Sequence, residues 1–281
     1  MTKVIEQRYG KARVRVLKVL REGAVHTLKD IEVAAMLQGD FASSYASRDN
    51  SKVVPTDTIK NTVNVFAQQH LAHEIERFAI TLGEHFVARY PEVRQADIEI
   101  SERKWERMTV NGRPHPHCFA AGGEARMFTR VVCTADAAEV TSGVRDLVIL
   151  KSTGSGFKDY PKDEFTTLPE TTDRILATSF SATWHFARPP QNYRAANEAI
   201  LEAMLKVFAD NYSPSAQATL FQMGEAALAT CAEIVRLDLA MPNKHCLLIN
   251  LTPFGLENQN EIFVPTDEPH GQIEVTVARD D

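Results

Sequence analysis

The sequence predicts an α+β protein whose antiparallel sheets carry helices on one face. Three observations support this: strand patterns of period two, helical periodicity between pairs of strands, and the return of the same order in the second half of the chain. The halves share this order but no residue-level identity. Because 281 residues can form two domains, we place them at 1–136 and 137–281.

Two strand patterns open the first half. The first, Lys11–Leu20, alternates until Leu17, where the break predicts either burial on both faces or a bulge. The second is Thr27–Ser43, and the polar stretch Tyr45–Lys52 reads as a loop. The first strand divides into a buried face and a charged face: Ala12, Val14 and Val16 against Lys11, Arg13 and Arg15.

A long helical region follows these strands. Apolar residues recur at three- and four-residue steps from Ile59 to Phe86, and Pro91 ends the pattern. Two more strands are predicted, Ala96–Val110 and Cys118–Thr134, separated by the turn-rich segment NGRPHPH.

The second half repeats this order. Ser213 is expected to cap a helix that has Pro214 at its first position. Each half alone would leave sheet edges exposed, which favours an assembly that closes the sheets into a barrel. The elements predicted before and after this helix are strands Glu139–Ser152 and Ile175–Arg188, helix Asn192–Asn211, and strands Glu233–Ala240, His245–Leu251 and Gln272–Arg279.

Composition excludes several classes of protein. The net charge is −6 and no long basic block occurs, which argues against a nucleic-acid partner. No apolar run reaches the ~20 residues of a membrane helix. The sequence shows neither a secretory h-region nor a C-terminal Ser-Lys-Leu, so we expect a cytoplasmic, bacterial location. The four cysteines form no C-x-x-C pair and are expected to be free, buried thiols.

The segment Leu147–Arg174, LVILKSTGSGFKDYPKDEFTTLPETTDR, carries the strongest functional signal. A strand pattern leads into a small-residue loop that presents Phe157, and the segment ends on Arg174. An aromatic ring and a planar cationic fork suit a flat, anionic heterocycle. The residues alone also allow a core aromatic at Phe157 and an ordinary surface ion pair at Arg174.

This segment and four others resemble the urate oxidase (uricase) family. The others are YGKARVRV at Tyr9–Val16, DNSKVVPTDTIKNT at Asp49–Thr62, SAQAT at Ser215–Thr219 and LAMPNKH at Leu239–His245. The resemblance implies two tandem T-fold domains per chain and a homotetramer. It also implies active sites at subunit interfaces and sheets that close into a tunnel.

The resemblance implies the substrate-binding residues. Arg174 and Gln217 would hold opposite sides of urate, and Phe157 would stack on the ring. The backbone N–H of Ala216 near a helix start would favour the anion. Without the resemblance, Gln217 reads as a solvent-facing helical residue.

The resemblance also implies a catalytic pair, Lys11 and Thr56, in which the lysine withdraws a proton through the threonine hydroxyl. Asp57 would orient Thr56 or contact the ligand through its backbone. By themselves, Lys11 reads as an exposed strand lysine and Thr56 as a helix cap. The pair is expected to come from the neighbouring subunit.

Asn243 and His245 lie two residues apart at a strand start, so alternation predicts that they share a face. In the family, the asparagine lies over the ring where dioxygen and water bind, and the histidine belongs to the proton relay. The alternatives are a turn residue and a half-buried strand histidine.

No metal or organic cofactor is expected. His70 with His73, and His115 with His117, have spacings that can bind zinc, but no third ligand stands at a telling distance. No phosphate-binding or dinucleotide-binding motif is present. The resemblance implies oxidation of urate by dioxygen to 5-hydroxyisourate and hydrogen peroxide. The alternatives are another T-fold enzyme acting on a pterin or purine, and a non-catalytic purine-binding tetramer.

Overall fold

The computed structural model describes residues 2–280 and divides into two compact units. Unit 1 comprises the chain up to Gly143 together with His185–Ala195. Unit 2 comprises Val144–Trp184 and the chain from Ala196 onward. No described helix has the length and apolar character needed to cross a membrane. The proposed division at residues 136 and 137 stays a prediction.

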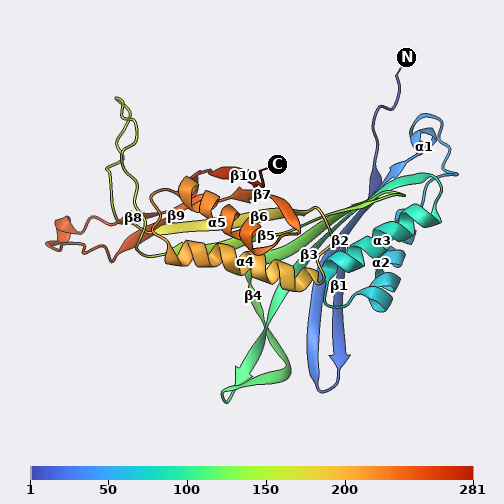
Figure 1. Ribbon diagram of the computed structural model, residues 1–281, viewed down its shortest axis with the longest axis horizontal. Helices are drawn as coiled ribbons and strands as arrows, with labels where there is room; N and C mark the ends of the chain where they lie inside the picture. The colour runs from blue at the N-terminus through green and yellow to red at the C-terminus, as the bar shows by residue number, and fades with distance from the viewer. Residues whose placement is uncertain (1, 281) are drawn as a thin grey trace. The chain divides into compact units, whose positions relative to one another are not determined.

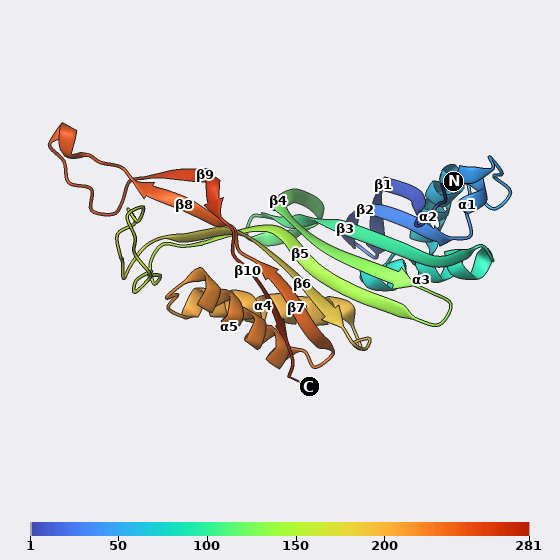
Figure 2. The same cartoon turned by 90° about the horizontal axis from the view of Figure 1, so that it is seen from above.

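Unit 1 is built on an antiparallel sheet in the order β1-β2-β3-β4 (Figure 1). Its helices lie on one face of this sheet, where α2 contacts β1 and α3 contacts β3 and β4 (Figure 2). The fold class predicted from the sequence is confirmed. The elements are β1 (Tyr9–Glu22), β2 (Val25–Gly39), α1 (Ala42–Ala46), α2 (Thr56–His70), α3 (Ile75–Arg89), β3 (Val93–Val110) and β4 (Arg113–Cys133).

The predicted long helix is two helices, so that expectation was wrong. The chain leaves the helical conformation at Leu71, whose ψ is 111°, and re-enters it at Ile75. The apolar period continues across this break, because Leu71 is itself buried. Both helices bury one apolar stripe, in which each large side chain contributes about 2 kcal/mol. The stripe residues include Ile59, Val63 and Ala67 of α2 and Phe78, Leu82 and Phe86 of α3.

Two loop predictions in unit 1 also need correction. The second strand ends at Gly39, and part of the expected loop forms the short helix α1. Within NGRPHPH only Asn111 and Gly112 make the turn, with φ values of 52° and 74°. Positive φ at both central residues is what a tight hairpin turn requires. The rest of the segment therefore belongs to β4.

Unit 2 contains the remainder of β5, which begins in unit 1, and pairs β7 with β10 in antiparallel register. The helices α4 and α5 cover one face of its sheet, and α5 contacts β7 and β10 (Figure 2). Trp184 is fully buried and its indole N–H donates to Asn197 Oδ1 at 2.9 Å. The elements are β5 (Ala138–Lys151), β6 (Leu176–Phe186), α4 (Tyr193–Asp210), α5 (Ala216–Thr230), β7 (Ile234–Ala240), β8 (Asn243–Leu248), η1 (Thr252–Phe254), β9 (Phe263–Gly271) and β10 (Glu274–Ala278).

The strand β9 was not predicted from the sequence. It pairs with β8 but most of its residues are exposed, so it lacks the alternation that marks a half-buried strand. The strand β8 begins at Asn243, two residues before the predicted start.

All four cysteines are free thiols, as predicted. Cys133 and Cys231 are buried, and burial raises the pKa of the Cys133 thiol to about 11. Cys118 and Cys246 are only half-buried, so the prediction of burial is wrong for these two.

Candidate active site

The residues predicted to act on the substrate fall into two groups, one on each unit. Lys11, Thr56 and Asp57 lie on unit 1. The second group lies on unit 2 and consists of Phe157, Arg174, Ala216, Gln217, Asn243 and His245. Their catalytic and binding roles stay predictions.

Lys11 lies beside a β-bulge in β1. It pairs with Ala35, but the next pair joins Val14 to Val33, so one extra residue is inserted in β1. Arg13 has a φ of 57° at this point. The bulge shifts the alternation and leaves Ala12 exposed, whereas the sequence predicted it on the buried face; the break at Leu17 is thus not where the irregularity lies.

The residue before Lys11 must be a glycine. A Cβ on Gly10 would lie 1.9 Å from the carbonyl oxygen of Ala35 and 2.7 Å from the Cα of Met36. Both atoms are backbone and cannot rotate away. The close approach of β1 and β2 thereby fixes the position of the backbone at Lys11.

Tyr9 connects the strand of Lys11 to the segment of Thr56. Its hydroxyl accepts a hydrogen bond of 2.7 Å from the backbone N–H of Val54, and its ring meets Phe41 edge-on at 4.8 Å. Burial raises the pKa of the Tyr9 hydroxyl. Tyr9 lies two residues before Lys11, and its hydroxyl bonds to Val54, which lies two residues before Thr56. This connection was not predicted from the sequence.

Thr56 is the first residue of α2 and does not cap it. The cap position belongs to Pro55, which makes no side-chain cap hydrogen bond. Asp57 pairs with Lys60 and accepts from Asn61 at 3.0 Å. The hydrogen bond from Lys60 lowers the pKa of Asp57 most, and the charge of Lys11 lowers it further.

On unit 2, backbone hydrogen bonds hold three separate segments together. Phe157 and Thr171 exchange bonds of 2.8 and 3.0 Å, and the N–H of Arg174 donates to Ser155 O at 2.7 Å. On the other side, Gly156 N–H donates to Ser213 O at 2.8 Å, and Ser213 N–H donates to Gly154 O at 2.9 Å. This backbone ladder brings Phe157, Arg174 and the chain just before α5 to one place.

Arg174 is not an ordinary surface ion-pair residue. Among the described residues it has no acidic partner, and its Nε is buried without a hydrogen bond. Its guanidinium carbon lies 5.3 Å from the centre of the Phe157 ring. Burial lowers the pKa of Arg174, and Tyr212 opposes this shift. The adjacent Asp173 accepts instead from Thr153 Oγ1 and Gly154 N–H, at 2.8 and 2.9 Å.

Phe157 has an aromatic neighbour that the sequence reasoning missed. Its ring stacks on Tyr160 at 4.8 Å with an interplanar angle of 15°. Gly156 is also required, since a Cβ there would lie 2.2 Å from Tyr212 Oη and 2.9 Å from Thr171 O. The Tyr212 hydroxyl, which donates to Thr172 O at 2.9 Å, thus packs directly against Gly156.

The cap of α5 is Ser215, so the prediction of Ser213 and Pro214 at the helix start was two residues early. Ser215 accepts from Ala218 N–H at 3.1 Å. Ser213 serves the backbone ladder instead, and its hydroxyl contacts Thr219 Oγ1 at 2.6 Å. Gln217 lies in the first turn, as predicted, and its side chain is exposed. Within the described chain, the N–H groups of Ala216 and Gln217 have no acceptor.

Asn243 and His245 lie on β8, next to the start of β6. Asn243 pairs with Thr178, which follows Arg174 by four residues. The register with β9 shifts between Asn243 and His245, and both side chains are half-buried. Thr178 Oγ1 is buried without a partner among the described residues. The predicted oxygen-handling residues thus lie on β8, which pairs with β6, the strand that follows Arg174 in the chain.

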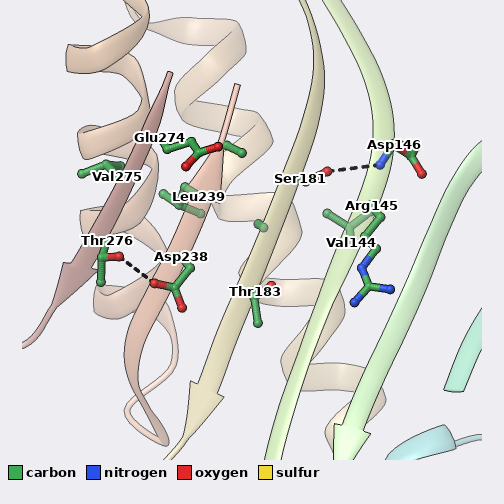
Figure 3. A pocket seen from close by; sticks show the side chains of 12 residues that line it. Val144, Arg145, Asp146, Ser181, Thr183, Asp238, Leu239, Glu274, Val275 and Thr276 are labelled. Carbon is green, nitrogen blue, oxygen red and sulfur yellow. Dashed lines mark hydrogen bonds between the residues drawn. The ribbon is translucent and has the colours of Figure 1, made fainter. Parts of the chain in front are cut away.

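A hollow on unit 2 lies elsewhere. It has a volume of about 560 Å³ and lies on the sheet face opposite to the helices (Figure 3). Thr276 Oγ1 donates to Asp238 Oδ1 at 2.6 Å, and Asp146 N–H donates to Ser181 Oγ at 3.3 Å. None of the predicted site residues lines it. We therefore assign the candidate site to the Arg174 loop and not to this hollow.

Fold and candidate site define a class: an α+β protein in which a half-buried guanidinium, stacked rings and the N–H groups of a helix start lie on one unit. The Uricase family model matches residues 7–132 and 140–274. The chain belongs to the uricase family. The resemblance found in the sequence is confirmed, and with it the prediction of an enzyme of this family.

Individual relatives match nearly the whole chain. It is 39% identical to the uricase of Arthrobacter globiformis over 99% of this chain and 91% of that protein. It is also 39% identical to the uricase of Arabidopsis thaliana, over 98% and 96% of the two chains. The crystal structure of the uricase from Arthrobacter globiformis gives a TM-score of 0.92 at 38% identity, covering 99% of this chain and 96% of that one.

Proposed function

We propose that the chain oxidises urate with dioxygen and water to 5-hydroxyisourate and hydrogen peroxide, and that it uses no metal or organic cofactor. Two electrons pass from urate to dioxygen, and water supplies the hydroxyl oxygen at C5. A deprotonated urate is rich enough in electrons to act as the donor. The protein then has to bind the anion, remove a proton and hold oxygen over the ring.

Arg174 is the observation that carries this proposal. A half-buried guanidinium whose Nε has no hydrogen bond, and which lacks an acidic partner among residues 2–280, is suited to an anion from outside the chain. Phe157 next to it offers a ring face to a purine. Gln217 and the N–H of Ala216 would grip the opposite edge of the ligand, since an amide both donates and accepts.

Lys11 and Thr56 would manage the proton. The Thr56 hydroxyl would pass it from urate to Lys11, and Asp57 would orient Thr56 or bind the ligand edge through its backbone. Asn243 would hold dioxygen and then water above the ring. His245 would return protons to the peroxide.

The assembly follows from the same proposal. A homotetramer would close the sheets into a barrel and bring Lys11, Thr56 and Asp57 of one subunit to the Arg174 loop of another. Large apolar side chains that are exposed in the single chain support an assembly. They include Val148, Leu150, Leu247, Leu248 and Phe254.

Urate consumption and peroxide release test the reaction. The full-length protein, treated with EDTA, is expected to consume urate under air and to release one peroxide per urate. Lys11→Ala is expected to lower kcat by ~100-fold, because general-base catalysis contributes on that order. The matched control is Lys104→Ala, which removes an exposed lysine that pairs with Glu106.

Four results would contradict this reading. An unchanged rate in Lys11→Ala would remove the lysine from the mechanism. Urate oxidation that disappears with EDTA and returns with a metal would contradict the cofactor-free reaction, and absence of urate oxidation would favour another T-fold enzyme acting on a pterin or purine. Tight urate binding without peroxide would indicate a non-catalytic purine-binding protein.

Mixing of two inactive variants tests the shared site. Co-expressed Lys11→Ala and Arg174→Met chains are expected to recover roughly a quarter of wild-type activity, because random assembly forms that fraction of intact interfacial sites. Lys11→Ala mixed with Thr56→Ala is the control, since both lesions fall on the same half of the site and no intact site can form. No recovery in the first mixture would place both groups within one subunit.

A further inference from the structure

We propose that His115, His117 and Cys118 of β4 bind a divalent transition-metal cation of the zinc class. Among residues 2–280 these side chains are the one group of three such ligands, and their ligand atoms all lie within 4.8 Å of one another. The site lies on unit 1 and involves no residue to which the proposed oxidation assigns a role. The expectation that His115 and His117 lack a third ligand is therefore wrong.

A β-bulge brings these three side chains together. Arg107 pairs with Phe119 and Thr109 pairs with Pro114, so four residues of β4 oppose the single residue Met108 of β3. In a regular strand, His117 and Cys118 would point to opposite faces. The bulge removes this constraint, and Pro116, which has no N–H to give a partner strand, is tolerated there.

Arg107 fixes the bulge from the neighbouring strand. Its Nη1 donates to the carbonyl oxygens of His115 and Pro116, both at 2.7 Å, and its Nη2 donates to His26 O at 2.5 Å. The guanidinium also lies 4.7 Å from the Phe119 ring. Its N–H groups are thus engaged by backbone carbonyls on both sides of the bulge, which holds the bulged backbone in place.

The ligand chemistry selects the metal. Two imidazoles and one thiolate suit zinc, whose bonds of about 2.0 Å to nitrogen and 2.3 Å to sulfur place tetrahedral ligand atoms ~3.5 Å apart. Partly exposed side chains can rotate to close this difference. A fourth position stays open to solvent, and the nearest further imidazole is His26, whose ring centre lies 6.0 Å from that of His117.

Cobalt substitution tests the site without using activity. Full-length, tag-free protein is stripped with EDTA, exchanged into metal-free buffer and titrated with Co²⁺. We expect a thiolate-to-cobalt charge-transfer band and the strong visible bands of tetrahedral Co²⁺. Stoichiometric Zn²⁺ should bleach both and raise the midpoint of thermal unfolding, because a cation that binds only the folded state stabilises it.

Matched cysteine variants decide the assignment. Cys118→Ser should lose the charge-transfer band and the zinc-dependent rise of the midpoint, whereas Cys246→Ser, at another half-buried free cysteine, should keep both. His117→Asn should weaken Co²⁺ binding while its metal-free circular dichroism stays that of the wild type. An absent thiolate band in the wild type, or an identical spectrum in Cys118→Ser, would overturn the proposal. Urate oxidation should be the same in Cys118→Ser, so the two proposals fail independently.

Discussion

Arg174→Met is expected to lower kcat/KM for urate by roughly 1000-fold. In the proposed complex the substitution removes two charge-assisted hydrogen bonds to urate, which together are worth about 4 kcal/mol, and each 1.4 kcal/mol is about a factor of ten. Arg174→Lys should recover only a small part of this loss. Its ammonium keeps the charge but cannot reproduce the planar fork.

The stability of the same variant separates binding from structure. Arg174 has no salt bridge within the described chain, and its Nε is buried without a partner. Its replacement by an apolar side chain of similar length should leave the free energy of unfolding within about 0.5 kcal/mol of the wild type, as for substitutions that break no network. Urea unfolding followed by circular dichroism measures this. A large loss of stability with unchanged kcat/KM would make Arg174 a structural residue.

Gly10→Ala is expected to destabilise the protein by about 3 kcal/mol or more, because the new methyl group meets backbone atoms that cannot move independently. The contact with Ala35 O at 1.9 Å requires β1 and β2 to separate. Urea unfolding again gives the free energy. Any folded fraction should have a reduced kcat, since Lys11 moves with the strand.

Gly271→Ala is the matched control for this substitution. A Cβ at Gly271 meets its nearest atom, Ile273 Cδ1, at an ordinary 3.5 Å. Its effect on the free energy of unfolding should stay below about 1 kcal/mol, as expected where a methyl group makes only ordinary van der Waals contacts. If both variants were equally stable, the close approach of β1 and β2 would be absent in solution.

Much of the fold could be predicted because buried faces place apolar residues in the sequence with the period of a strand or a helix. The helix α4 and every strand except β9 follow from alternation and from three- and four-residue steps. The break between α2 and α3 does not interrupt this period, because buried Leu71 continues the pattern while its backbone is extended. The exposed strand β9 had no pattern to find.

The site shows the same limit. Arg174 and Phe157 stood out in the sequence, and the structure brings them to 5.3 Å of one another. The bulge beside Lys11 and the bulge that gathers His115, His117 and Cys118 are backbone irregularities set by pairing with a distant strand. Tyr9 was missed because a hydroxyl that reaches across 45 positions of sequence has no local signature. Tyr160 could have been proposed from the sequence, because it is an aromatic residue only three positions after Phe157.

The paired backbone hydrogen bonds of Phe157 and Thr171 close the chain between them into a loop. Inside it, Lys162 pairs with Glu170 at 2.8 Å and Tyr160 donates to Leu168 O at 2.5 Å. Because both ends of this loop are already held together, lengthening it adds only the entropic cost of loop closure, about 0.6 kcal/mol for each doubling of its length. Insertions between Asp163 and Leu168 should thus be tolerated by the fold. This exposed tip offers a point for attaching a second protein or a surface anchor at little thermodynamic cost.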